Sequence, residues 1–280
     1  MDSPSYRLAA ADPDFLRGDD TRGLRLLLDY LKPELALQRH GVTRTIVVFG
    51  STRICEPAAA RRRVDEAGAR LDAAGGPQAA PQLAEKLDIA ERILARSHYY
   101  DEARAFCRLV AEANAGAEPP TTLVMTGGGP GIMEAANRGA FDAGAETIGL
   151  NIALPHEQYP NPYVTPDLCF QFHYFALRKL HFMQRARALV AFPGGYGTLD
   201  ELFELLTLVQ TGVMAPIPII LVGADYWRRA VDFDFLVSEG VIDRADRALF
   251  SFAETAQDIL DALLSWERAA QAGSAKAAPR

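Results

Sequence analysis

Three glycine-bearing turns follow strand-like segments, and each offers backbone amides that can bind an anion. They lie at Gly50–Arg53, Gly127–Glu134 and Pro193–Glu201. Glycine lets an anion approach the backbone closely, and a helix that begins directly after such a turn adds free N–H groups and the positive end of its dipole. One such turn alone is more typical of a tight strand-to-helix connection. Three turns at the same edge of one sheet favour a phosphate site.

The residues predicted to contact the phosphate are Ser51, Gly128, Gly129, Gly131, Gly194, Gly195, Gly197 and Thr198. Thr198 stands near the expected start of a helix, where its hydroxyl can cap the helix or donate to the same anion. The second turn does not fit G-x-G-x-x-G, because Ile132 occupies the place of the last glycine, and the chain contains no G-x-x-x-x-G-K-[ST]. A compact monophosphate therefore fits better than NAD or ATP bound by a P-loop.

Charged residues near the third turn indicate what chemistry the phosphate site serves. Asp200 and Glu201 are expected on the first turn of the helix, where a carboxylate commonly faces the helix dipole. Either could fill that role, which leaves the other for catalysis. Arg178 and Lys179 interrupt an aromatic and apolar stretch. That pattern is equally typical of a solvated helix face and of an arginine that clamps a phosphate and a base.

Other common kinds of site find little support in the sequence. The five histidines show no metal-ligand spacing, so no metal is predicted, and no serine lies in a G-x-S-x-G elbow. The three cysteines are widely separated and form no C-x-x-C pair, which is typical of buried thiols in a reducing compartment. No cofactor is expected.

The elements that must position these turns are short apolar runs that alternate with helical patterns. Most of the runs lack polar alternation, as expected for strands buried on both faces. The predicted strands are Thr45–Phe49, Thr122–Thr126, Thr147–Ile152, Leu168–Phe172, Ala188–Phe192, Ile217–Val222 and, more weakly, Ala248–Phe252. The alternation predicts an α/β fold: a doubly wound, Rossmann-like, mostly parallel sheet flanked by helices.

The expected organisation is a single domain with additions. Residues 1–43 form an N-terminal helical extension, interpreted as packing, with a helix near Leu24–Leu37. Residues 44–268 form the nucleotide-binding catalytic domain, and residues 269–280 a flexible tail. A long insert follows the first strand, with one helix near Ala58–Ala74 and another that reaches about Ala113.

Composition limits the class of protein. Hydrophobic residues make up 49% and charged residues 23% of the 280 residues, an ordinary globular balance. The net charge of -7 argues against a protein that coats nucleic acid, although a pocket can still be locally positive. No signal peptide or membrane-length apolar run is recognisable, so a cytoplasmic protein with no membrane partner is expected.

Two motifs together resemble one known family. Gly127–Asn137 and Pro193–Glu201 are similar to the paired motifs of the Lonely Guy (LOG) family, which is often labelled lysine decarboxylase. Every fixed position of the second motif, P-G-G-x-G-T-x-x-E, is present. Gly149–Tyr163 and Phe175–Met183 also resemble the family, and the likeness covers roughly residues 44–265. The N-terminal extension and the insert around Gly75–Tyr100 make this chain longer than the compact plant-type members.

The resemblance implies an activity, a site and an assembly. It implies a hydrolase that cleaves the N-glycosidic bond of a cytokinin riboside 5′-monophosphate, or of a purine nucleotide such as AMP. It assigns the catalytic roles to Arg178 and Glu201. It also implies a homodimer or a higher homo-oligomer with the active site near a subunit interface; the aromatic segment Phe170–Met183 is either that contact or core. The alternatives are a non-catalytic nucleotide- or cofactor-binding protein and a phosphoribosyl transferase.

Overall fold

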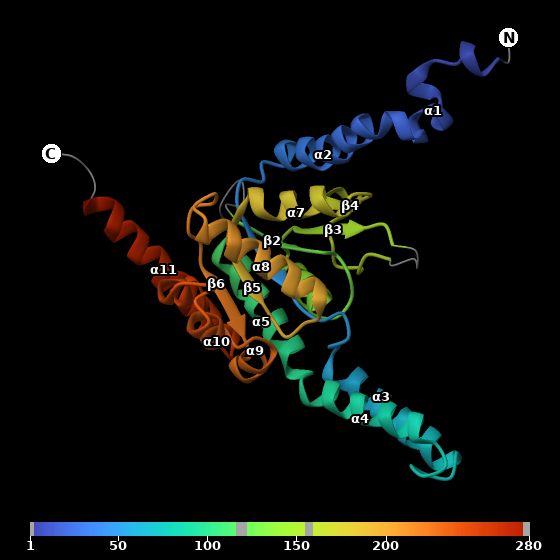
Figure 1. The fold of residues 1–280 in the computed structure, drawn as a ribbon, viewed down its shortest axis with the longest axis vertical. Coiled ribbons are helices and arrows are strands. Elements are labelled where there is room, and N and C mark those ends of the chain that lie inside the picture. The colour runs from blue at the N-terminus through green and yellow to red at the C-terminus, as the bar shows by residue number, and fades with distance from the viewer. Residues whose placement is uncertain (1–2, 116–121, 155–158, 277–280) are drawn as a thin grey trace.

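The computed structural model describes residues 3–115, 122–154 and 159–276. Its centre is one seven-stranded sheet in which each paired neighbour is parallel, in the order β4-β3-β2-β1-β5-β6-β7 (Figure 1). The strands are β1 Thr45–Phe49, β2 Leu123–Thr126, β3 Thr147–Ile152, β4 Cys169–Phe172, β5 Ala186–Ala191, β6 Ile219–Val222 and β7 Ser251–Ala253. The predicted doubly wound, parallel sheet is confirmed.

The strand order reverses between β1 and β5. The chain builds outward from β1 to β4, then returns to the other side of β1 and builds outward again to β7. Phe49 and Ala191, the last residues of β1 and β5, are register partners, so the two strands end at the same level. The connections that follow them lead away in opposite directions, and a crevice opens at the carboxyl edge of the sheet. Ligands of such sheets bind at this point.

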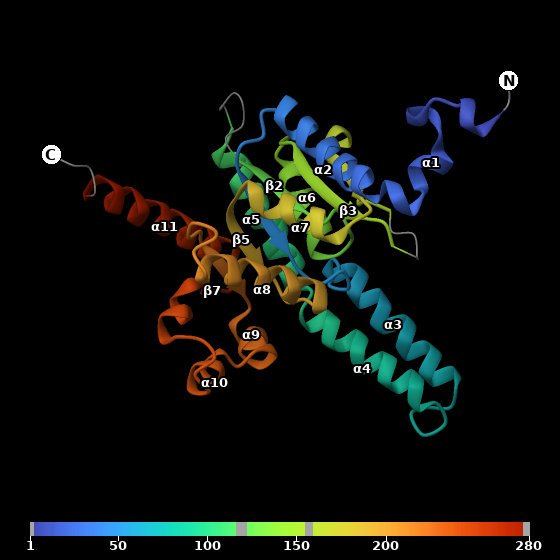
Figure 2. The same cartoon turned by 45° about the horizontal axis from the view of Figure 1, so that its top comes forward.

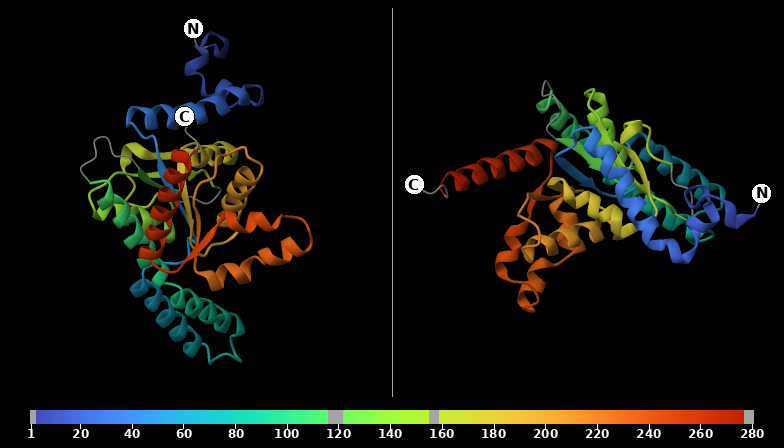
Figure 3. Two further views of the ribbon diagram at one scale, coloured as in Figure 1. Left: turned by 90° about the vertical axis from the view of Figure 1, so that its left-hand side faces the viewer. Right: turned by 90° about the horizontal axis from the view of Figure 1, so that it is seen from above.

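Helices cover both faces of the sheet, which explains why most strands lack polar alternation (Figure 3). In β1, Val47 and Phe49 join one apolar cluster, while Ile46 and Val48 join the other. The first cluster includes side chains of α2 (Arg22–Arg39), α7 (Phe175–Gln184), α8 (Tyr196–Gln210), α9 (Ala224–Ala230) and α10 (Phe233–Ser238). The second includes side chains of α5 (His98–Ala113), α6 (Ile132–Asp142) and α11 (Ala256–Lys276).

The additions to the sheet lie at its margins. In the insert after β1, α3 (Pro57–Ala73) and α4 (Pro81–Ala95) pack on each other and project from the body as a helical hairpin (Figures 1 and 2). The short α1 (Pro13–Arg17) precedes α2. Short 3₁₀ turns lie at Pro4–Tyr6, Ala9–Ala11, Asp19–Thr21, Pro166–Leu168 and Arg244–Leu249.

The C-terminal helix α11 runs to Lys276, well into the segment 269–280 for which the sequence predicts a flexible tail. Residues 277–280 of that predicted tail lie outside the described residues, as do residues 155–158 of the family-like stretch Gly149–Tyr163. None of the helices in the described ranges is long and apolar enough to cross a membrane.

Candidate active site

A cavity of about 500 Å³ lies where the strand order reverses, at the carboxyl ends of β1 and β5. It contains both predicted catalytic residues, Arg178 and Glu201. The residues that line it come from β1 and its turn (Phe49–Arg53), the turn and helix after β2 (Gly127 and Met133), β3 and the turn after it (Asn151, Ile152 and Leu154), α7 (Phe175, Arg178 and Phe182) and the start of α8 (Gly195–Thr198 and Glu201). Of the predicted phosphate contacts, Ser51, Gly195, Gly197 and Thr198 line the cavity.

The other predicted phosphate contacts, Gly128, Gly129, Gly131 and Gly194, do not line it. Two of them show why the chain needs glycine there. Gly131 has a φ of +74°, and a Cβ on it would collide with the backbone of Ser51 and Thr52. Gly128 has a φ of +69°, and its Cβ would stand 3.3 Å from the Cα of Gly149. These two glycines let the turn after β2 pack against neighbouring backbone.

Two asparagines hold that turn in place. Asn161 donates its side-chain N–H to the carbonyl of Gly129 at 3.0 Å and to Oδ1 of Asn137 at 2.9 Å. Asn137 is fully buried and also accepts a bond from the hydroxyl of Thr126, which in turn accepts one from the amide of Gly128. The network satisfies buried polar groups and fixes the course of the turn. Asn161 lies in the family-like stretch Gly149–Tyr163, but its type and position in the sequence predicted no role for it.

The start of α8 differs from its prediction. The helix begins at Tyr196 with Gly195 as its N-cap, so Glu201 lies on the second turn and not the first. No side chain caps this helix, so Thr198 does not take the first of its two possible roles, and donation to an anion stays a prediction. Within the described residues, the amides of Tyr196, Gly197 and Thr198 meet no protein acceptor. They are free donors at the positive end of a 15-residue helix, which is a ready anion site.

Glu201 and Arg178 form a buried ion pair across the cavity wall. Oε1 of Glu201 accepts a hydrogen bond from Nη2 of Arg178 at 2.9 Å, and their side chains are 4% and 12% exposed. The side chains of a helix lean toward its N-terminus, so Glu201 lies over the turn that offers the free amides. Its Oε2 would stand 3.9 Å from a Cβ on Gly197, so the absence of a side chain there keeps space open before the carboxylate.

Burial governs the protonation of this pair. Desolvation raises the pKa of Glu201 to about 7, and the charge of Asp200 adds to the rise, while Arg178 acts in the opposite direction. Burial also lowers the pKa of Arg178, which Glu201 counteracts. The Nε of Arg178 is buried and meets no acceptor within the described residues. The guanidinium therefore keeps one buried donor without a protein acceptor, while the Arg178 side chain lines the cavity.

The neighbouring charges separate into a second pair. Lys179 lies 2.8 Å from Asp200 and 3.1 Å from Glu204, and the side chain of Asp200 is 55% exposed. Asp200 thus points to the surface, while Glu201 points into the cavity. The two adjacent carboxylates, which the sequence could not tell apart, have different environments. Arg178 does not lie on a solvated helix face, because its side chain is only 12% exposed.

The remaining wall of the cavity is apolar and aromatic. The guanidinium of Arg178 lies over the rings of Phe175 and Phe182, whose centroids are 5.2 and 5.5 Å from its Cζ. Met133 and Ile152 add aliphatic surface. A site with polar donors on one wall and such a surface on another can bind a ligand that has an anionic end and a flat, weakly polar end.

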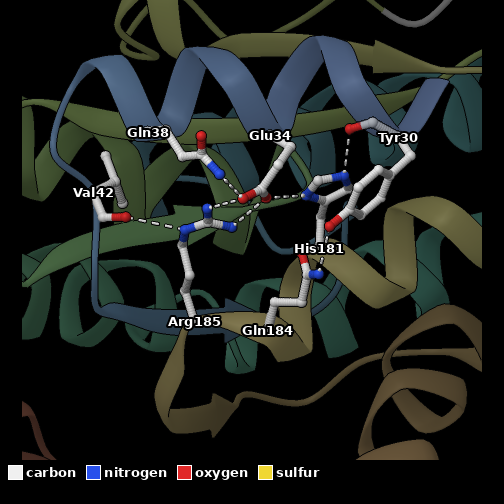
Figure 4. A network of polar contacts seen from close by, with 7 residues as sticks. All are labelled: Tyr30, Glu34, Gln38, Val42, His181, Gln184 and Arg185. Carbon is white, nitrogen blue, oxygen red and sulfur yellow. Dashed lines mark hydrogen bonds and ion pairs between the residues drawn. The ribbon is translucent and has the colours of Figure 1, made fainter. Parts of the chain in front are cut away.

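The N-terminal helix α2 supports the helix that carries Arg178 (Figure 4). Glu34 of α2 accepts hydrogen bonds from both terminal nitrogens of Arg185, at 2.7 and 2.8 Å, just after the end of α7. The ring of Tyr30 stacks on that of His181, whose Nε2 lies 3.1 Å from the carbonyl of Tyr30. These contacts bind α2 to the C-terminal half of α7.

Asp29 holds the segment that leads into the other end of the same helix. Its carboxylate accepts hydrogen bonds from the amides of His173, at 3.1 and 3.2 Å, and of Tyr174, at 3.0 Å, directly before α7 begins. The carboxylate satisfies two backbone amides directly before the helix, near the positive end of the helix dipole. The extension, interpreted from sequence as packing, therefore fixes both ends of the helix that presents Arg178. No motif in the extension signals this.

Known proteins resemble the chain over this region. The family described as possible lysine decarboxylase matches residues 133–263. A probable cytokinin riboside 5′-monophosphate phosphoribohydrolase of Oryza sativa subsp. japonica, LOGL3, is 31% identical over 150 residues, which are 50% of this chain and 67% of that protein.

Two solved structures also resemble it. The X-ray structure of TM1055 matches with a TM-score of 0.46 and 20% identity, over 78% of this chain and 96% of that one. The Moco carrier protein of Chlamydomonas reinhardtii matches with a TM-score of 0.42 and 21% identity, over 60% and 86% of the two chains. The paired motifs, the parallel sheet and the curated relatives agree: the chain belongs to the lysine decarboxylase-like LOG family, as a distant homologue of the cytokinin riboside 5′-monophosphate phosphoribohydrolases.

Proposed function

We propose that this protein hydrolyses the N-glycosidic bond of a purine nucleoside 5′-monophosphate and releases the free base and ribose 5-phosphate. The observation that carries the proposal is the position of Glu201, a buried carboxylate on the turn that follows the free amides of α8. A phosphate on those amides holds the ribose of the same molecule within reach of the carboxylate. The curated relatives named for this reaction support the proposal from sequence.

Each predicted site residue has a role in this proposal. The amides of Gly195, Tyr196, Gly197 and Thr198, with the hydroxyls of Ser51 and Thr198, bind the 5′-phosphate. The remaining glycines of the prediction, such as Gly128 and Gly131, shape the turn behind them.

The reaction breaks the bond between C1′ and the base nitrogen. The base leaves with the bonding electrons and takes up a proton, while positive charge spreads over C1′ and the ring oxygen. The Glu201 carboxylate stabilises that charge and accepts a proton from the water whose oxygen bonds to C1′. Arg178 holds Glu201 through Nη2 and, as part of the cavity wall, holds the nucleotide in register. The exposed ring of Phe175 offers a surface for the base.

We also propose that the enzyme needs no cofactor, acts in the cytoplasm and assembles as a homo-oligomer. The substrate carries its own phosphate, and the chemistry needs no cofactor or metal. Free cysteines at positions 55, 107 and 169 are consistent with a cytoplasmic location. A homodimer or larger homo-oligomer is also proposed. Phe175, at 52%, and Leu180, at 42%, are the large apolar side chains of Phe170–Met183 that are exposed for such a contact, whereas Phe172 and Phe182 are core.

Product analysis tests the function. The purified protein is incubated with AMP, with other nucleoside monophosphates and with an isoprenoid-modified adenine nucleotide, and the products are separated by chromatography. Hydrolysis predicts free base and ribose 5-phosphate in equal amounts, and the preferred nucleotide identifies the base. A phosphoribosyl transferase would release base without ribose 5-phosphate and only with a second substrate. A binding protein would release neither.

A further inference from the structure

The phosphate-binding turn before α8 is held from outside the cavity by Tyr226. The hydroxyl of Tyr226, on α9, donates a hydrogen bond to the carbonyl of Gly194. Gly195, the next residue, lines the cavity, whereas Gly194 and Tyr226 do not. In a planar trans peptide the C=O and the following N–H point in opposite directions. The bond to Tyr226 therefore directs the N–H of Gly195 to the side of the turn on which the cavity lies.

The helix that carries Tyr226 is rigidly attached to the sheet. Its neighbour Trp227 is fully buried and donates from Nε1 to the carbonyl of Ala191 at 3.1 Å and to that of Val222 at 3.0 Å. These are the last residues of β5 and β6. The Tyr226 ring packs edge-on against Trp227, with centroids 5.4 Å apart, and the guanidinium of Arg96 lies over it at 5.7 Å. These contacts fix the ring of Tyr226 and therefore the direction in which its hydroxyl donates.

The other side of the turn is held by a backbone bond. The amide of Ser51 donates to the carbonyl of Pro193 at 2.9 Å. With Tyr226 on Gly194, two successive carbonyls of the turn are occupied by donors of the protein itself. Neither carbonyl oxygen is then free to face an anion, which it would repel. The donors of the turn remain.

We propose that Tyr226 is a positioning residue for the phosphate subsite, which sets the orientation of the Gly194–Gly195 peptide and so presents the Gly195 amide to the substrate phosphate. This inference rests on the proposed function only for the identity of the ligand. It predicts a defect confined to ligands that carry a phosphate, because Tyr226 does not line the cavity in which Glu201 and the base wall lie.

The test uses Tyr226→Phe, which keeps the ring and its contacts with Trp227 and Arg96 and removes only the hydroxyl. Dissociation constants are measured for ribose 5-phosphate and for adenine. Loss of one preset hydrogen-bond donor is expected to weaken ribose 5-phosphate binding by about three- to tenfold and to leave adenine binding unchanged. Tyr100→Phe is the matched control, since it removes another buried tyrosine hydroxyl bond, to Glu134 at 2.9 Å, away from the cavity.

Equal weakening of both ligands in Tyr226→Phe, no weakening of either, or the same loss in Tyr100→Phe would overturn the assignment. A second measurement needs no variant: in the wild-type protein, the Gly195 amide resonance must shift on saturation with ribose 5-phosphate, and an unmoved resonance contradicts the proposal. The outcomes separate the two claims. If the wild-type protein releases no base from AMP, but Tyr226→Phe weakens the binding of ribose 5-phosphate and not of adenine, the hydrolase proposal fails and the positioning role stands.

Discussion

Glu201 of α8 and Arg178 of α7 meet at 2.9 Å inside the cavity, from helices that follow different strands of the sheet. The pair connects the two halves of the doubly wound fold. The helix α7 follows β4 at one edge of the sheet, and α8 follows β5 beside β1. The protonation and position of Glu201 therefore depend on both halves. Most of the consequences below follow from this contact.

The rate of base release should fall in acid. Burial raises the pKa of Glu201 to about 7, so the carboxylate takes up a proton as the pH drops through neutrality and loses the charge that stabilises C1′. With saturating AMP, kcat should be constant above pH 8 and decrease about tenfold per unit below pH 6.5. A kcat that stays level down to pH 5 would contradict the assignment.

Removal of the Arg178 charge should move the acidic decrease in kcat (the acid limb of the pH profile) to higher pH. Arg178 is the main influence that keeps the pKa of Glu201 from rising further, so Arg178→Gln should shift the limb to higher pH and lower kcat by about two orders of magnitude. Lys179→Gln is the comparison, because the Lys179 charge has a smaller effect on Glu201. An unshifted limb in Arg178→Gln would show that the pair does not set the protonation of Glu201.

Substitution of two glycines should distinguish a glycine that faces the anion site from one that packs against backbone, although both lie in glycine-rich turns. Gly195 has a φ of -94° and open space where a Cβ would stand, so Gly195→Ala should fold normally. The methyl group would enter the anion site, and ribose 5-phosphate should bind about tenfold or more weakly.

Gly131→Ala should instead cost stability, by about 2 kcal/mol or more, since it combines a positive φ with a collision against the Ser51 backbone. Thermal unfolding of both variants measures the difference. A destabilised Gly195→Ala, or a fully stable Gly131→Ala, would reverse these assignments.

The N-terminal helix should stabilise the fold through Glu34. The bonds from Arg185 hold the pKa of Glu34 below its ordinary value of 4.5, so the contribution is present above that value and is lost as the pH falls through the lowered pKa. Glu34→Gln should reduce the free energy of unfolding at pH 7 by about 1–3 kcal/mol, since the pair is 13% and 11% exposed.

The control for Glu34→Gln is Asp88→Asn. Its partner Arg92 lies 2.8 Å away, but both side chains are more than half exposed, so the loss should stay below about 1 kcal/mol. Equal losses in the two variants, measured by urea unfolding at pH 7, would mean that α2 is not bound to the body through Glu34.

The sheet was predictable because its strands are buried on both faces. Runs such as Thr45–Phe49 and Thr147–Ile152 are continuous and apolar, and the structure reproduces both with the same bounds. Strand order was not available from these patterns, since it depends on which runs pair across the chain. Helix ends were less certain: α8 begins three residues before the predicted Leu199, because glycine and tyrosine in Gly195–Gly197 gave no start signal.

The site was predictable only in part. The glycine turns and the P-G-G-x-G-T-x-x-E motif pointed to the residues that line the cavity, including Glu201. They could not separate the glycines that face the cavity from those, such as Gly131, that pack against backbone. Asp29, Asn161 and Tyr226 act through contacts with segments far away in sequence, and residue type and spacing do not reveal such contacts.

The central claim is that Glu201 acts directly on the sugar of a phosphate-anchored nucleotide. The measurement that tests it most directly is the rate of adenine release from saturating AMP by Glu201→Gln and by the wild-type protein, with AMP binding determined for both. We predict that the variant binds AMP within about threefold of wild type and releases adenine about 10²–10⁴ times more slowly. A variant that releases adenine at near the wild-type rate would contradict the account.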